Sequence, residues 1–218
     1  MTSAARIKEL AEETAKAFAI RPARPEDCGD IAMLFLLSSG GLAEYIWSQA
    51  GPPRARRCSR PAASAMPGRA WTSSYQNCLV AEEDGQVIAM LHSFVMPPRD
   101  ETGDEAAAND NDNGEPVDPV LQPYAELEDP GSLYVSGVAV TPEHRGRGLG
   151  RKLMEQARAR AEALDLPRVS LICFEANETA MQLYRRLGYA EVDRRPVVPH
   201  PSLHYSAGDA VLLVRGLD

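Results

Sequence analysis

The sequence predicts an α/β fold in which a mixed parallel and antiparallel sheet is flanked by helices. Apolar runs typical of strands are interspersed with stretches that have the apolar period of helices. An Asp-Gly pair at 84–85 lies between two apolar runs and predicts a tight hairpin. A length of 218 residues, with 44% hydrophobic and 25% charged residues, suffices for one domain with its own core. We therefore expect a single domain over residues 1–218.

The expected order is strand, two helices, three strands, helix, strand, helix and two strands. An amphipathic N-terminal helix over residues 1–18 is expected before them. The strands are expected at 19–23, 78–82, 86–96, 133–140, 168–174, 189–193 and 209–215. The helices are expected from Pro25 to Gly40–Gly41, in a short stretch from Leu42, and over 151–164 and 177–187, with glycine or proline marking several of their ends.

Two segments lack the composition of buried elements. Residues 51–71 contain five Arg, four Pro and five Ala but no acid, Val, Ile or Leu, so we expect an irregular loop. An out-of-frame stretch in a GC-rich gene would have the same composition, and resequencing would test that. Residues 100–130 contain 11 acids and no Lys or Arg, which predicts an acidic insertion loop between strands.

No metal site is expected from these residues. The Asn/Asp alternation from Asn109 to Gly114 resembles the start of a calcium loop, but the twelfth position is Val120 instead of Glu. The four cysteines are widely spaced and form no C-x-x-C pair, and only four histidines are present. Reduced cysteines and the lack of a signal peptide predict a cytoplasmic location.

The net charge of −8 is mostly a property of the acidic segment. Without its 11 acids the rest of the chain would carry +3. The acidic total argues against a general nucleic-acid binder. No apolar run approaches the length of about 18 residues that a membrane span requires. We expect neither nucleic acid nor membrane as a partner.

The turn at residues 145–150 is the segment most typical of a ligand site. Its three glycines allow a close backbone approach and positive φ angles, and it leads from a strand into a helix. The first N–H groups of a helix are unpaired and favour anions, and Arg145, Arg147, Arg151 and Lys152 add positive charge. The turn therefore predicts a diphosphate site. Its glycine spacing matches neither a P-loop nor a dinucleotide-binding fingerprint.

In combination with its surroundings, this turn resembles the GNAT superfamily of N-acetyltransferases. The pyrophosphate signature R/Q-x-x-G-x-G/A is matched by Arg145, Gly148 and Gly150, after a strand that ends Val-Ala-Val. A second motif about thirty residues later is matched by Asn177, Ala180, Tyr184, Gly188 and Tyr189. The similarity covers residues 133–193, and the Ile-Arg-Pro-Ala opening at 20–23 also fits. No similarity extends to 42–77 or 100–130.

The resemblance implies a cofactor-binding role for two segments. The backbone of Val138, Ala139 and Val140 would bind the pantetheine arm of acetyl-CoA, and an N–H near Val138 would polarise the thioester carbonyl. The diphosphate would be bound by the N–H groups of Arg145, Gly146, Arg147, Gly148, Leu149, Gly150 and Arg151. Asn177 would contact the pantetheine or cap its helix.

The same resemblance implies the catalytic groups. Tyr184 would protonate the leaving thiolate, because an ordinary phenol and an alkyl thiol have similar pKa values; the alternative is a core aromatic residue. Many relatives carry an acid two residues before the position of Val138, where this chain has Ser136. Glu126 is the first candidate for the general base, with Glu128, His92 and Tyr134 as alternatives acting through water.

We therefore expect an acetyl-CoA-dependent N-acetyltransferase that acts on a primary amine by direct attack in a ternary complex. The acidic segment favours a cationic acceptor, either a small molecule or a peptide, and the resemblance is compatible with a homodimer. The alternative is a non-catalytic acyl-CoA-binding or regulatory domain, suggested by the missing strand acid and by the unusual 51–71 segment.

Overall fold

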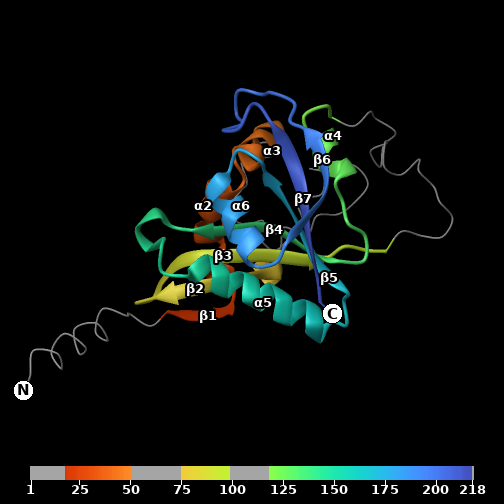
Figure 1. The fold of residues 1–218 in the computed structure, drawn as a ribbon. Coiled ribbons are helices and arrows are strands. Elements are labelled where there is room, and N and C mark those ends of the chain that lie inside the picture. Colours follow the sequence, from red (N-terminus) through yellow and green to blue (C-terminus); the bar gives the residue numbers. More distant parts are fainter. Residues whose placement is uncertain (1–17, 51–74, 99–117, 218) are drawn as a thin grey trace, which may run out of the picture.

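The computed structural model describes residues 18–50, 75–98 and 118–217 (Figure 1). The helix expected over 1–18 and the loop expected over 51–71 lie outside the described residues, apart from Phe18. The same holds for the acidic segment up to residue 117. All seven expected strands are present.

The strands form one seven-stranded sheet in the order β1-β2-β3-β4-β5-β7-β6. Among the described strands, β4 and β5 are parallel and all other neighbours are antiparallel. The predicted mixed sheet flanked by helices is therefore confirmed. The strands are β1 (Ala19–Pro22), β2 (Cys78–Glu83), β3 (Gln86–Val95), β4 (Leu133–Val140), β5 (Arg168–Phe174), β6 (Ala190–Pro196) and β7 (Asp209–Gly216).

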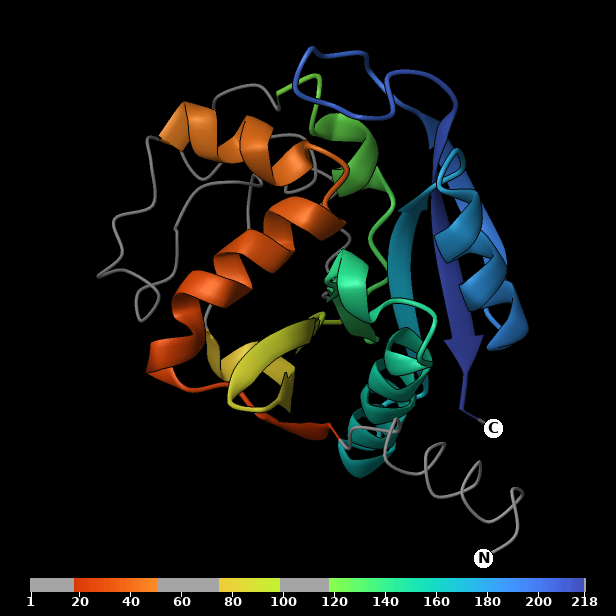
Figure 2. The ribbon, with the colours of Figure 1, turned by 90° about the vertical axis from the view of Figure 1, so that its left-hand side faces the viewer.

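Helices cover both faces of this sheet (Figure 2). Leu153 and Ala157 of α5 are buried with Leu91 and Val135 of the sheet. On the opposite face, Leu34 of α2 is buried with other apolar side chains of β2, β3 and β4. The α-helices are α2 (Cys28–Ser38), α3 (Leu42–Ala50), α4 (Gln122–Glu126), α5 (Leu149–Ala163) and α6 (Glu178–Arg186); short 3-10 helices are η1 (Pro25–Asp27), η2 (Tyr75–Asn77) and η4 (Pro142–His144).

The structure differs from the predicted acidic loop over its last part. Residues 122–126 form α4 instead of loop, and Tyr124 and Leu127 are buried with Tyr45 of α3. The acids of this segment dominate its average composition, but apolar residues at 120, 121, 124 and 127 have helical spacing and supply a buried face. The acidic average composition of residues 100–130 therefore predicted a loop where a local amphipathic pattern forms a helix.

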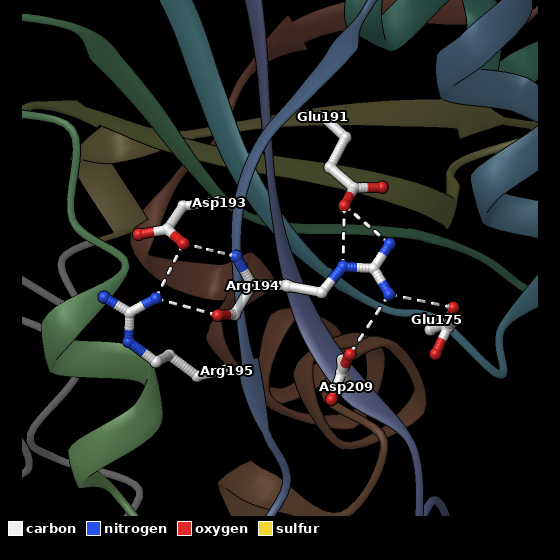
Figure 3. A network of polar contacts seen from close by, with 6 residues as sticks. All are labelled: Glu175, Glu191, Asp193, Arg194, Arg195 and Asp209. Atoms are coloured by element: carbon white, nitrogen blue, oxygen red, sulfur yellow. Dashed lines mark hydrogen bonds and ion pairs between the residues drawn. The ribbon is translucent and has the colours of Figure 1, made fainter.

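The edge strand β6 carries a network of exposed ion pairs (Figure 3). Arg194 contacts Glu191, Glu175 and Asp209 at 2.6 to 3.3 Å, and Arg195 contacts Asp193 at 2.6 Å. Exposed pairs of this kind add little stability individually. Charged side chains along an edge strand do, however, discourage pairing with another chain.

No single helix in the described ranges is long and apolar enough to cross a membrane. The helix pair Pro25–Ser38 and Leu42–Gln49 meets the length and composition test together, but it is bent by 118°.

Candidate active site

The ladder between β4 and β5 ends after three residue pairs. Its register runs from Leu133–Val169 to Val135–Leu171, and beyond it the two strands diverge (Figure 1). Just after β4, Thr141 donates its backbone N–H to Ile88 of β3 at 3.0 Å. Successive residues of a strand direct their backbone N–H and C=O groups to opposite neighbouring strands. The backbone groups of Val138 and Val140 therefore point toward β5. Their N–H groups therefore face the gap where the ladder has ended.

A β-bulge at Ser136 accompanies this separation. Ser93 lies opposite Val135 and His92 lies opposite Gly137, so Ser136 is the extra residue on β4. A bulge bends its strand and increases the local twist, which favours the divergence from β5. At Gly137 an added Cβ would lie 3.2 Å from the Phe35 and Ser38 side chains of α2, so α2 packs closely on this part of β4.

The glycine turn provides an open surface at the start of α5. Gly146 and Gly148 have φ angles of 77° and 80°, which L side chains rarely adopt. A Cβ added at either position would meet no atom of the described structure within 4 Å. Gly148 occupies the N-cap, where no side chain caps the α5 residues that the structure describes. The N–H groups of the first turn are therefore available for an anion.

The arginines of the turn differ in their contacts. Arg147 donates two hydrogen bonds to Glu83 of β2, at 2.7 and 3.0 Å, and this carboxylate raises the pKa of the guanidinium. Glu83 is buried and also lies 3.3 Å from the His144 ring. Arg151 instead forms an exposed pair with Glu155. Both charges are thus offset by carboxylates.

Arg145 lies at the open end of the strand gap. Its Nε donates to the carbonyl oxygen of Val140 at 3.2 Å. A carbonyl is neutral, so this contact leaves the positive charge of Arg145 for an anion. Among the three arginines of the turn, Arg145 is thus the one whose charge no carboxylate of the described residues is shown to offset.

Helix α6 lies close to the same region. The Asn177 side chain caps the helix by accepting a hydrogen bond from the Ala180 N–H at 3.3 Å. A Cβ added at Gly150 would lie 3.4 Å from Leu183, so α6 packs directly on the start of α5. Tyr184 of the same helix is buried in one cluster with Leu149, the first residue of α5.

Tyr184 is buried and its ring lies edge-on to Tyr189, with centroids 5.8 Å apart. Burial raises the pKa of its hydroxyl well above the ordinary value, so the phenol is protonated at neutral pH. The neighbouring Cys173 of β5 responds in the same way, because burial raises the pKa of its thiol to about 12. The environment disfavours phenolate and thiolate alike.

Among the described residues, no contact is seen between Glu126 and the predicted residues of β4, the glycine turn or α6. It belongs to α4, about two fifths exposed, and accepts a hydrogen bond from Arg195 of β6 at 2.7 Å. Its other oxygen accepts from Gln122. The structure thus brings the predicted strand, turn and α6 residues together, whereas Glu126 lies in an ion pair at the β6 edge.

Sequence reasoning did not predict two contacts of the site. One is the Glu83–Arg147 pair, whose partners are 64 residues apart and which no local pattern indicates. The other is a hydrogen-bond contact between His92 Nδ1 and Ser136 Oγ. These residues lie on β3 and β4, which the predicted 84–85 hairpin does not join, and the bulge that aligns them is not visible in the sequence. In the described residues, no group of three or more His, Cys, Asp or Glu side chains is arranged to hold a metal ion.

The family comparison identifies this architecture. The model of the acetyltransferase (GNAT) family matches residues 46–189, about two thirds of the chain. The chain therefore belongs to the GNAT acetyltransferase family, as its resemblance in sequence predicted.

Solved structures share the fold. An N-acetyltransferase from Staphylococcus aureus Mu50 aligns with a TM-score of 0.56 and 20% identity, over 90% of this chain and 100% of that one. A putative acetyltransferase from Salmonella typhimurium, solved with its cofactor acetyl-CoA, aligns with a TM-score of 0.51 and 18% identity, over 93% and 95%. Identities this low show a common fold alone.

The curated relatives match a shorter segment. Mycothiol acetyltransferase from Thermobispora bispora is 44% identical over 59 residues, which are 27% of this chain and 19% of that protein. The chain spans about a fifth of the length of the curated relatives it matches.

Proposed function

We propose that the protein transfers the acetyl group of acetyl-CoA to a primary amine by direct attack within a ternary complex. The observation that carries this proposal is the divergence of β4 from β5 beside the open glycine turn. The gap exposes the N–H groups of Val138 and Val140, and the turn exposes those at the start of α5. Family membership supports the same cofactor.

The residues present fit acetyl-CoA as a co-substrate. The edge of Val138, Ala139 and Val140 offers hydrogen bonds to an extended amide chain such as pantetheine. The turn from Arg145 to Arg151 offers uncapped N–H groups, positive φ angles and the charge of Arg145 to a diphosphate. Asn177 holds the start of α6 beside this surface.

Two groups then act on the reaction. The Val138 N–H stabilises the oxyanion that forms as the amine attacks, which is usually a large contribution to catalysis. Tyr184 gives its proton to the sulfur when the carbon–sulfur bond breaks. Burial raises the pKa of the Tyr184 hydroxyl, so the phenol carries its proton and can act as the acid.

The acceptor is less well defined by these contacts. In the described part of the acidic segment, Glu126 pairs with Arg195 and Asp129 pairs with Arg168. Two acids of the segment are thus already paired, and an attraction for a cationic amine would come from its other acids. Glu126 stays a candidate base, although a guanidinium already occupies one of its oxygens.

Initial-rate kinetics test the proposal. Purified protein is assayed for free CoA release from acetyl-CoA with a panel of primary amines. We expect release that depends on an amine and double-reciprocal plots that intersect, as direct transfer requires. Parallel plots would indicate an acetyl-enzyme. Binding of acetyl-CoA without amine-dependent release by any amine would favour the non-catalytic alternative.

A further inference from the structure

We propose that Ser136 and His92 form the relay that takes a proton from the acceptor amine. The proposal rests on the proposed acetyl transfer and names the group that deprotonates the acceptor. It assigns a role to the position where the sequence offers no acid. The geometry comes from two neighbouring strands and from the bulge that separates their registers.

The two side chains differ in access. His92 is 2% exposed, whereas Ser136 is half-buried and directly follows Val135, where the ladder to β5 ends. The His92 Nδ1 is in hydrogen-bond contact with the Ser136 hydroxyl. An amine in the gap would therefore touch Ser136 and reach the imidazole only through it.

The bulge makes this contact possible. As the extra residue on β4, Ser136 lies on the face that His92 also faces, together with Gly137. The imidazole is held between Phe35 of α2 and Phe94 of β3, with ring centroids 5.1 and 5.8 Å away. This packing fixes the ring, so its Nδ1 stays directed at the hydroxyl.

The spacing to the oxyanion donor is suitable. Ser136 and Val138 are two residues apart, about 6.6 Å along a strand. During attack, the amine nitrogen and the thioester oxygen are bonded to the same carbonyl carbon. With one hydrogen bond of about 3 Å from each of them, this group spans the distance between Ser136 and Val138. The amine nitrogen can thus contact Ser136 while the carbonyl oxygen contacts the Val138 N–H.

The protons balance over the reaction. The bound ammonium gives one proton to the Ser136 oxygen as the serine proton moves to His92 Nδ1, which leaves a neutral amine and an imidazolium. The amine lone pair forms the bond to the carbonyl carbon, and the carbon–sulfur bond breaks as Tyr184 protonates the sulfur. Of the three ammonium protons, one stays on the amide, one returns from His92 through the Ser136 hydroxyl to water after the product leaves, and one replaces the proton that Tyr184 gave. An imidazole suits this role because its ordinary pKa is about 6.5.

Matched amines of different basicity test the relay. The probes are 2-phenylethylamine, which is an ammonium at neutral pH, and its near-isostere O-benzylhydroxylamine, which is already neutral. His92→Asn places an amide near the Nδ1 position, so it keeps the contact with Ser136 but cannot take a proton. We expect kcat with 2-phenylethylamine to fall by about 100-fold. With O-benzylhydroxylamine it should change little, and the KM for acetyl-CoA should be unchanged.

Two further variants sharpen the result. His204→Asn is the matched control, because His204 is exposed and its recorded contact is a backbone N–H to Gly40. Ser136→Ala removes only the relay hydroxyl at a half-buried position, and it should show the same dependence on amine basicity even if His92→Asn fails to fold. Glu126→Gln would show that dependence instead if Glu126 were the base.

The outcomes separate the two proposals. Equal losses with both probes, or full activity of His92→Asn with 2-phenylethylamine, would overturn the relay and leave the proposed function intact. Failure of the wild-type protein to acetylate either probe or any amine of the panel would contradict the proposed function, and the relay would fall with it.

Discussion

Tyr184 combines two properties that together define its predicted role. It is buried, and within the described residues its hydroxyl has no hydrogen-bond partner. Its ring contacts Tyr189, so a phenylalanine would keep the packing. Tyr184→Phe is therefore expected to lower kcat by about 100-fold while the Kd for acetyl-CoA stays within a factor of about two. Steady-state rates and calorimetric titration measure the two quantities; a parallel loss of affinity would indicate a core role only.

Arg145 and Arg151 form a natural pair for comparison. Both lie at the turn, but Arg151 pairs with Glu155 whereas Arg145 contacts a neutral carbonyl. Because a charge-assisted hydrogen bond contributes about 1.5 to 3 kcal/mol, Arg145→Ala should raise the Kd for acetyl-CoA by about 10- to 100-fold. Arg151→Ala should have a much smaller effect. Calorimetry on both variants measures this difference, and equal effects would argue against a particular role for Arg145.

The pair of Arg21 and Asp27 predicts a pH dependence of stability. Two hydrogen bonds from Arg21, at 2.7 and 3.0 Å, hold the pKa of the buried Asp27 carboxyl below its ordinary value. A depressed carboxyl pKa stabilises the native state above the unfolded value of about 3.9, and this stabilisation is lost as the pH falls through the folded value. Wild type should therefore exceed Asp27→Asn in free energy of unfolding at pH 7, by about 1 to 3 kcal/mol. Denaturant unfolding of both proteins at pH 7 and below pH 3 measures this difference in free energy of unfolding, which should shrink at the lower pH. A difference that stays constant would contradict the prediction.

At the scale of elements, the turn before α5 can be tested through two of its glycines. Gly148 has a φ of 80°, whereas Gly150 lies within α5, where an added Cβ makes an ordinary 3.4 Å contact with Leu183. Gly148→Ala should destabilise the protein by about 1 kcal/mol and weaken acetyl-CoA binding, because the strained turn no longer presents its N–H groups together. Gly150→Ala is the control and should leave both nearly unchanged. Thermal unfolding and acetyl-CoA titration measure the two effects.

Elements governed by local chemistry were predictable from the sequence. Asp84 and Gly85 both adopt positive φ, as the predicted hairpin turn requires. The helix after the glycine turn also follows from its apolar period, although it begins at Leu149, two residues earlier than expected. The α4 helix was missed because its five residues lie within a segment whose average composition is acidic.

Features that depend on long-range contacts were not predictable. The insertion of β7 between β5 and β6 and the end of the β4–β5 ladder at Val135 depend on packing across the whole sheet. The Glu83–Arg147 pair changes the interpretation of the turn, because it offsets one of the predicted cations. The sequence pattern therefore did not show which arginines of the turn are paired with carboxylates.

At the scale of the whole molecule, charge is arranged by segment. The total of −8 would become +3 without the acids of 100–130. The glycine turn, the strand gap and α6 lie together on the body of the molecule, where an anionic co-substrate would bind. The net charge alone would not indicate the anionic co-substrate that we propose.

The central claim is acetyl transfer from acetyl-CoA to an amine. The most direct measurement incubates the protein with acetyl-CoA labelled in the acetyl group and a panel of primary amines, and follows label and free CoA by mass spectrometry. The account predicts labelled N-acetyl amine in a one-to-one ratio with CoA, and a rate that falls sharply in Tyr184→Phe. Release of CoA with labelled acetate as the product, or no release with any amine, would contradict it.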